Sequence, residues 1–330
     1  MARTPTLAAS FALLLSWCYA SFAFQPPSSD TTRSIPPRLR TELAANTIVP
    51  EAHLRVDSSL VLIPVHVTTP DGFSVTNLAK ENFALKEDSV EQTITHFSKG
   101  DAPISVGLLF DSSGSMHNKM SKSLEAVARF LKTSNTEDEF FLIEFNEKPK
   151  LLVPLTPDSD EIYRRAARIR PFGRTSLLDA IHIALVQMKK ARNFRKAIVI
   201  LSDGGDNRSR FTASEIKNDM LETDVQLFAM GIFDDSVHRQ TVEEQNGPRL
   251  LDELAEQTGG RMYTVDNLDD LESISARISQ ELRDQYLLGY SPTNNSRDGK
   301  YRQVRLKLDA PAELPKLHAN YRHGYYAPSE

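Results

Sequence analysis

The sequence predicts an α/β protein in which a doubly wound, mostly parallel sheet is inserted in, or flanked by, a small β-sandwich-like domain. Three observations lead to this prediction. Two apolar runs of strand length, Val106–Phe110 and Ala197–Leu201, end abruptly in acidic, hydroxyl-containing turns, which is typical of strands buried on both faces of a parallel sheet. Strand and helix patterns alternate through the middle of the chain. Segments with period-two alternation precede and follow that region.

Residues 1–24 have the pattern of a secretory signal peptide. Arg3 precedes an apolar core at 7–19, and Ser21-Phe22-Ala23 matches the small-x-small pattern of a cleavage site. The core is shorter than the roughly 20 apolar residues that span a bilayer; a retained amino-terminal anchor is the alternative. Cys18, the only cysteine, lies in this segment, so the mature chain would have neither disulfides nor thiol chemistry. We therefore expect a secreted, periplasmic or cell-envelope-associated protein.

The composition is that of a soluble globular protein, with 330 residues of which 25% are charged and 40% hydrophobic. The formal net charge of -5 provides no basic excess that would favour nucleic acid or an anionic membrane surface. No later apolar run is long enough to cross a bilayer, so we expect no integral span after signal cleavage. Residues 25–50 begin with a stretch rich in Pro, Ser and Thr and predict an extended linker.

Residues 51–100 predict a β-rich accessory segment. Apolar residues alternate with other residues over Val61–Val67, and Asp71-Gly72 provides a turn. Phe83 and Leu85 continue the alternation, and Gln92–Phe97 is placed to pair back as a hairpin.

Residues 101–285 carry the alternating strands and helices. Beyond the two apolar runs, strands are expected at 140–145, 151–155, 225–232 and 261–265, and helices at 120–131, 162–169, 177–188, 214–222, 250–257 and 268–282. Right-handed crossovers between such strands produce a mostly parallel sheet with helices on both faces.

Residues 286–330 return to β structure. Strands are expected at Tyr286–Tyr290 and Tyr301–Leu308, and a further one within Leu317–Tyr326. Neither β flank alone has enough strands for an independent core. Together with 51–100 this segment could form one small sandwich; two unrelated flanking hairpins are the alternative.

Three separate segments predict one metal site. Asp111, Ser113 and Ser115 follow the first apolar strand, Thr175 opens a later helix, and Asp203 follows the second apolar strand. If the two strands are neighbours, these loops converge at the carboxyl edge of the sheet, where open α/β proteins bind ligands. Hydroxyl and carboxylate oxygens suit Mg²⁺ or Mn²⁺, with Ca²⁺ less favoured.

The charge of this site predicts what it recruits. Two carboxylates and three hydroxyls do not fully enclose a dication, so an acidic side chain of a partner protein would complete the coordination. Helix capping by Asp111, Ser113 or Thr175 is the plainer interpretation of each residue taken singly. Asp179 is expected to be an acid favoured by the helix dipole. The acids Asp206, Asp234 and Asp235 would lie at the same edge, either solvated or shaping the site or a second ion.

Enzymatic function is not expected. The chain has no H-E-x-x-H, no G-x-S-x-G and no G-x-x-x-x-G-K-[ST] motif, and no base is paired with a nucleophile. A phosphotransferase with Asp111 as nucleophile would generally need a second acid at position 113 to hold Mg²⁺, but this position is serine. The alternatives to a binding module are a scaffold whose metal only stabilises loops and a metal-dependent phosphoester hydrolase.

The D-x-S-x-S of Asp111, Ser113 and Ser115, the later Thr175 and the S-D-G of Asp203 resemble the metal-ion-dependent adhesion site (MIDAS) of von Willebrand factor type A domains. The resemblance covers about residues 103–285. It implies a Rossmann-like sheet with the ion at its top, held directly by the three hydroxyls and often through water by the two carboxylates. It also implies adhesion or complex formation through an acidic partner.

The flanks resemble those of secreted bacterial proteins with von Willebrand-like domains, of which acidobacterial proteins are typical. The segments that carry this resemblance are 82–88, 286–290 and 322–326.

Overall fold

The computed structural model describes residues 60–233 and 242–329. The signal and linker predictions for residues 1–24 and 25–50, and the acids Asp234 and Asp235, lie outside these ranges. In the part of the chain that is described, no helix has the length and apolar character needed to cross a membrane. The described residues belong to one compact unit.

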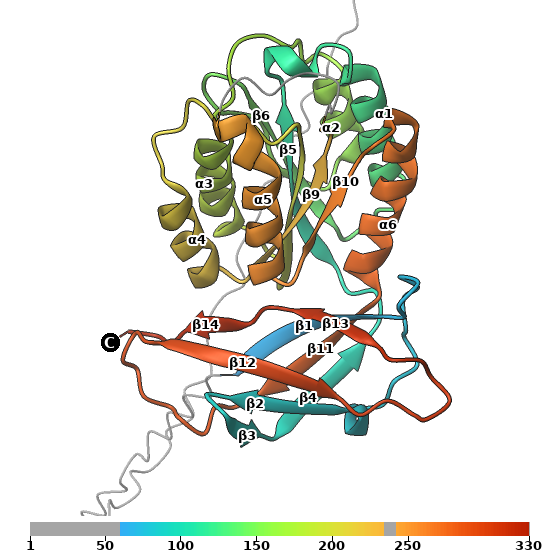
Figure 1. The fold of residues 1–330 in the computed structure, drawn as a ribbon, viewed down its shortest axis with the longest axis vertical. Helices are drawn as coiled ribbons and strands as arrows, with labels where there is room; N and C mark the ends of the chain where they lie inside the picture. Colours follow the sequence, from blue (N-terminus) through green and yellow to red (C-terminus); the bar gives the residue numbers. More distant parts are fainter. Residues whose placement is uncertain (1–59, 234–241, 330) are drawn as a thin grey trace, which may run out of the picture. The chain divides into compact units, whose positions relative to one another are not determined.

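A six-stranded sheet is the centre of the α/β region (Figure 1). Its strands, in spatial order, are β10 (Arg261–Thr264), β9 (Val225–Gly231), β8 (Arg195–Ser202), β5 (Ile104–Asp111), β6 (Glu139–Phe145) and β7 (Lys150–Thr156). All neighbouring pairs are parallel except β6 and β7, which are antiparallel. The two apolar strands of the sequence, β5 and β8, are neighbours at the centre of the sheet.

Helices cover both faces of this sheet. The helices α1 (Met120–Leu131), α2 (Ser159–Ala166) and α6 (Leu271–Arg283) contribute to the apolar core on one face. The helices α3 (Leu177–Met188), α4 (Ala213–Glu222) and α5 (Val242–Gln257) cover the other face. This is a doubly wound arrangement, and it confirms the predicted fold class.

Strand β5 shows why the sequence folds this way. All eight of its residues are buried. Its side chains alternate between the two cores, so Leu108 and Phe110 pack on one face while Leu109 packs on the other. Because both faces of this strand pack against apolar layers, polar residues cannot alternate with apolar ones along it. The run is therefore continuously hydrophobic.

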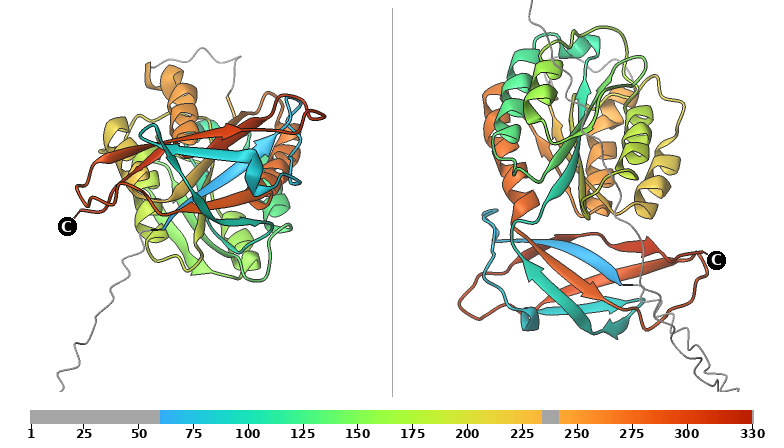
Figure 2. Two further views of the ribbon diagram at one scale, coloured as in Figure 1. Left: turned by 90° about the horizontal axis from the view of Figure 1, so that it is seen from below. Right: turned by 180° about the vertical axis from the view of Figure 1, so that it is seen from behind.

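The segments before and after the α/β region pair with each other in two four-stranded sheets (Figure 2). One has the order β13 (His318–Tyr321), β1 (Val61–Thr68), β11 (Gln285–Tyr290) and β4 (Ile94–Lys99). The other has the order β14 (Gly324–Tyr326), β12 (Tyr301–Leu308), β2 (Phe83–Glu87) and β3 (Val90–Gln92).

Each of these sheets contains strands from both flanks, as the pairs β1–β11 and β2–β12 show. One apolar core, which includes Ile63, Leu85, Tyr286 and Val304, joins the two sheets. The flanks are therefore not two unrelated hairpins. The strand expected within Leu317–Tyr326 is two short strands, β13 and β14, because the chain crosses from one sheet to the other between them.

A buried histidine connects β1 to α6. The Nε2 of His66 lies 2.9 Å from the Oγ of Ser74, and its Nδ1 lies 3.7 Å from an Oε of Glu281 on α6. Burial, followed by the charges of Arg261 and Arg277, lowers the pKa of His66 to about 4. The ring is therefore neutral in the folded protein at neutral pH.

We expect His66 to contribute a decrease in the free energy of unfolding as the pH falls from about 6.5 to about 4. The unfolded chain protonates this histidine near pH 6.5, whereas the folded chain resists protonation down to the lowered pKa, so the unfolded state binds more protons in this window. The loss at pH 4 should be about 1 to 3 kcal/mol, reduced by attraction of the protonated ring to Glu281.

Urea unfolding at several pH values measures this dependence. The variant His66→Gln keeps a side-chain amide that can hydrogen-bond to Ser74 but has no proton to take up. Its stability should therefore decrease less, or increase more, than that of the wild type over the same window. Equal slopes for wild type and variant would show that His66 is not the titrating group.

Candidate metal centre

The end of β5 and the loop that follows it place Asp111, Ser113 and Ser115 around one point. Asp111 is fully buried; its Oδ1 accepts a hydrogen bond from the Ser113 amide at 2.8 Å, and its Oδ2 accepts one from the Ser202 hydroxyl at 2.6 Å. The hydroxyls of Ser113 and Ser115 lie 3.1 Å apart. The Asp111 carboxylate therefore forms the base of the loop, and the two serine hydroxyls lie together beside it.

The loop before α3 is joined to this first loop by its backbone. The amide of Gly114 donates to the carbonyl of Gly173 at 3.0 Å. Gly173 has a φ of 75°, a conformation that strongly favours glycine. Beyond it, the amide of Thr175 donates to the side chain of Asn207, and the amide of Asn207 donates to the Thr175 carbonyl, both at 3.1 Å.

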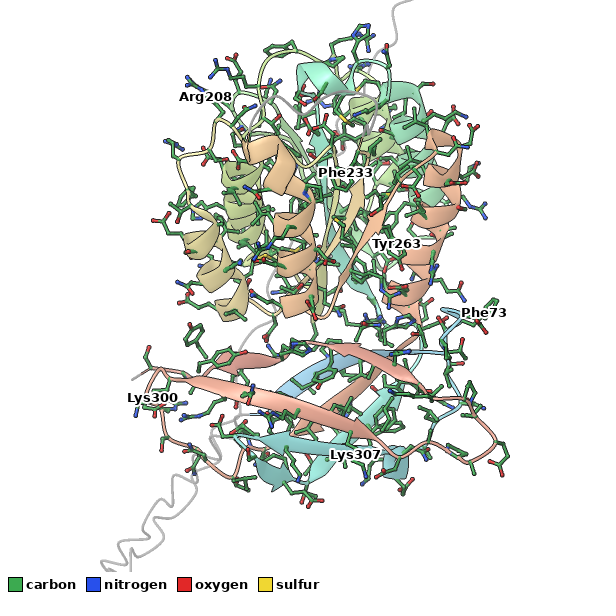
Figure 3. All side chains as sticks on the ribbon, viewed as in Figure 1. Phe73, Arg208, Phe233, Tyr263, Lys300 and Lys307 are labelled. Atoms are coloured by element: carbon green, nitrogen blue, oxygen red, sulfur yellow. The ribbon has the colours of Figure 1, made fainter. Side chains whose placement is uncertain are left out.

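The third loop follows β8 and presents Asp203, whose side chain is 14% exposed. Ser113, Ser115, Thr175 and Asp203 all line one cavity of about 490 Å³. Phe233, labelled in Figure 3, also lines it. Asp111 lies beneath the cavity and contacts Ser113 and Ser202, the latter being the neighbour of Asp203. The structure thus brings together all five residues that the sequence singles out.

The electrostatics of this cluster suit a cation. Burial, with the negative charge of Asp203 in addition, raises the pKa of Asp111 to about 7. A dication between the two carboxylates would remove that repulsion. Among the described residues no group of three or more His, Cys, Asp or Glu could hold a metal ion. A metal centre formed by the described residues would therefore include hydroxyl oxygens, and the three hydroxyl residues that line this cavity are of the type that Mg²⁺ and Mn²⁺ accept.

Helix capping does not account for the hydroxyl residues. Ser113 precedes the short 3₁₀ helix η2 (Gly114–Met116), yet its side chain makes no capping hydrogen bond. The N-cap residue of α3 is Ser176, not Thr175. These side chains are thus available to the cavity.

Two neighbouring acids organise the surrounding loops. Asp206 accepts hydrogen bonds from the amide of Leu178, at the start of α3, and from the amide of Ser209. Asp179 accepts hydrogen bonds from the amides of Arg210 and Phe211, at 2.8 and 3.2 Å. Asp206 is thus neither a free solvated acid nor turned to the cavity, and Asp179 does more than favour the helix dipole.

Sequence reasoning did not identify Asn207 and Lys119. Asn207 holds Thr175 in place, and its position in an Asp- and Gly-rich turn was the signal available. Lys119 lies 3.4 Å from Asp203 and lines the cavity, but no pattern in the sequence indicates where its side chain turns.

A family model described as the von Willebrand factor type A domain matches residues 106–205. An uncharacterized protein of Borreliella burgdorferi is 25% identical over 210 residues, which are 56% of this chain and 60% of that protein. Inter-alpha-trypsin inhibitor heavy chain H2 of Mesocricetus auratus is 29% identical over 148 residues, which are 39% of this chain and 16% of that protein. The chain therefore spans less than two thirds of the length of these relatives.

Solved structures show similarities that are weaker in sequence. A von Willebrand factor type A structure from Catenulispora acidiphila is 13% identical, with a TM-score of 0.48 and 73% of each chain covered. The protein BatB from Bacteroides thetaiotaomicron is 19% identical, with a TM-score of 0.44, and the match covers 54% of this chain and 98% of that one.

Proposed function

Because the chain contains a von Willebrand factor type A domain, we propose that it is an exported protein-binding or adhesion module whose partner is recruited through a divalent cation. The cation, Mg²⁺ or Mn²⁺, would be held by Asp111, Ser113, Ser115, Thr175 and Asp203. It would supply an open coordination position for an Asp or Glu side chain of the partner.

The observation that carries this proposal is the convergence of three hydroxyl side chains and Asp203 on one cavity above a buried carboxylate. The three loops of the site are already joined, the first to the second through the Gly114–Gly173 hydrogen bond and the second to the third through the Thr175–Asn207 hydrogen bonds. An ion is therefore not needed to hold these loops together, which favours recruitment of a partner over a purely structural metal.

The walls of the cavity favour a negatively charged partner. Of the described residues that line it, Lys119 and Arg174 are cationic, whereas Asp203 is the only acid. A cationic rim attracts carboxylates and increases the rate of their encounter. An acidic surface segment of another protein is thus the chemistry that this site fits best.

Binding without catalysis is part of the proposal. The cavity presents no nucleophile activated by a neighbouring base among the described residues, and its buried acid Asp111 is held by Ser202 and Ser113. The pattern of residues 1–24 supports a location outside the cytoplasm, at the cell envelope or beyond.

We expect metal-dependent capture of a partner from an envelope extract. The wild-type chain should retain a partner in Mg²⁺ and release it on addition of EDTA, and Asp203→Ala should retain none. The matched control is Asp252→Ala, which removes an exposed carboxylate on α5 that does not line the cavity.

A phosphoester panel assayed with Mg²⁺ or Mn²⁺ tests the enzymatic alternative on the same samples. Turnover by the wild type that Asp111→Ala abolishes would favour a hydrolase and contradict the proposal. Capture that is insensitive to EDTA, or equal for wild type and Asp203→Ala, would also contradict it.

A further inference from the structure

Lys119 occupies an electrostatically unfavourable position. It is the N-cap residue of α1, where the helix carries partial positive charge, and its side chain makes no capping hydrogen bond. The ammonium group turns instead toward the cavity, where it donates to the carbonyl of Ile232 at 3.0 Å and to an Oδ of Asp203 at 3.4 Å. Only 12% of the side chain is exposed, so solvent screens this charge weakly.

The position of this ammonium changes the charge of the metal centre. A dication with the carboxylates of Asp111 and Asp203 sums to zero, whereas the same set with Lys119 carries one positive charge. A fixed positive charge beside a bound cation raises the free energy of the loaded site. The same charge lowers the free energy of an anionic group that binds next to the ion.

We propose that Lys119 determines both the affinity of this centre for the metal ion and the charge of the partner that it selects. Lys119 interacts with Asp203, which also holds the ion, and so weakens ion binding. It also leaves the loaded site with a net positive charge that selects a carboxylate. This inference rests on the proposed function, because it requires that the cavity bind a divalent cation. Lys119 is thus a specificity-determining residue rather than a metal ligand.

A purely structural role makes a different prediction. If Lys119 served only to join the start of α1 to Asp203 and Ile232, removing its charge would loosen the site and weaken both metal and partner binding. If it sets the charge, the two affinities change in opposite directions. The variant Lys119→Met keeps most of the aliphatic stem while it removes the charge, and Lys119→Arg keeps the charge.

The test measures binding of Mn²⁺ alone, at low ionic strength, from the electron paramagnetic resonance signal of the Mn²⁺ that stays free in solution. Lys119→Met should bind Mn²⁺ at least about fivefold more tightly than wild type, with the difference reduced in high salt. Lys119→Arg should stay within about twofold of wild type. The matched control is Lys122→Met on the same helix, an exposed lysine paired with Glu125 and Asp269, which should also stay within about twofold.

A second titration adds a synthetic tetraglutamate peptide to protein saturated with Mn²⁺. The wild type should bind this peptide several-fold more tightly than Lys119→Met. Unchanged or weaker Mn²⁺ binding by Lys119→Met, or unchanged or tighter peptide binding, would overturn the inference while the metal centre itself stands. A wild-type chain that takes up no Mn²⁺ would overturn the proposed function and this inference together.

Discussion

Replacement of Gly260 by alanine is expected to lower the free energy of unfolding by at least about 3 kcal/mol or to prevent folding. A Cβ at this position would stand 2.7 Å from the carbonyl carbon of Leu227 and closer still to its oxygen. Leu227 is buried in β9, and its backbone is held in place because its amide donates a hydrogen bond to the Thr258 hydroxyl at 2.9 Å. The clash is therefore with backbone that cannot move aside.

Urea unfolding followed by circular dichroism measures this effect. The matched control is Gly114→Ala, where a Cβ would meet the Gly173 carbonyl oxygen at 3.4 Å and the stability should change by less than about 1 kcal/mol. A Gly260→Ala protein as stable as the wild type would show that the connection between α5 and β10 can move away from the added methyl group and would contradict the prediction.

Removing two of the hydroxyls together, in Ser113→Ala/Ser115→Ala, is expected to weaken Mn²⁺ binding by about 100-fold or more. The two hydroxyls hydrogen-bond to each other and lie at the cavity, so their loss removes two of the proposed ligands without opening a core. The free energy of unfolding should change by less than about 1 kcal/mol.

Calorimetric titration with Mn²⁺ and urea unfolding of the same samples test this prediction. Ser121→Ala, which removes an exposed hydroxyl from α1, is the matched control and should bind Mn²⁺ as the wild type does. Wild-type affinity in the double variant would exclude these serines as ligands. Loss of the circular dichroism spectrum would show that they serve the fold instead.

The α/β fold could be predicted because its determinants are local. The run in β5 is apolar throughout since both of its faces are buried, and the matching run in β8 lies beside it. The positions of Asp111 and Asp203 follow, because residues at the ends of neighbouring parallel strands lie at one edge of the sheet.

The rest depends on contacts between distant segments that no periodicity encodes. The pairing of β1 with β11 brings Val65 opposite Tyr286, although the whole α/β region separates these two residues in the sequence. The hydrogen bonds between Thr175 and Asn207 depend on the path of two loops. The contact of the Lys119 ammonium group with Asp203 could likewise not be predicted, because the position of Lys119 at the start of a helix indicates no such partner.

Anomalous scattering from a crystal grown with millimolar Mn²⁺ tests the metal centre most directly. We predict one strong peak in the cavity, about 2.1 Å from the hydroxyl oxygens of Ser113 and Ser115 and within reach of Thr175. No peak among these three hydroxyls, or Mn²⁺ bound only elsewhere on the chain, would contradict the account.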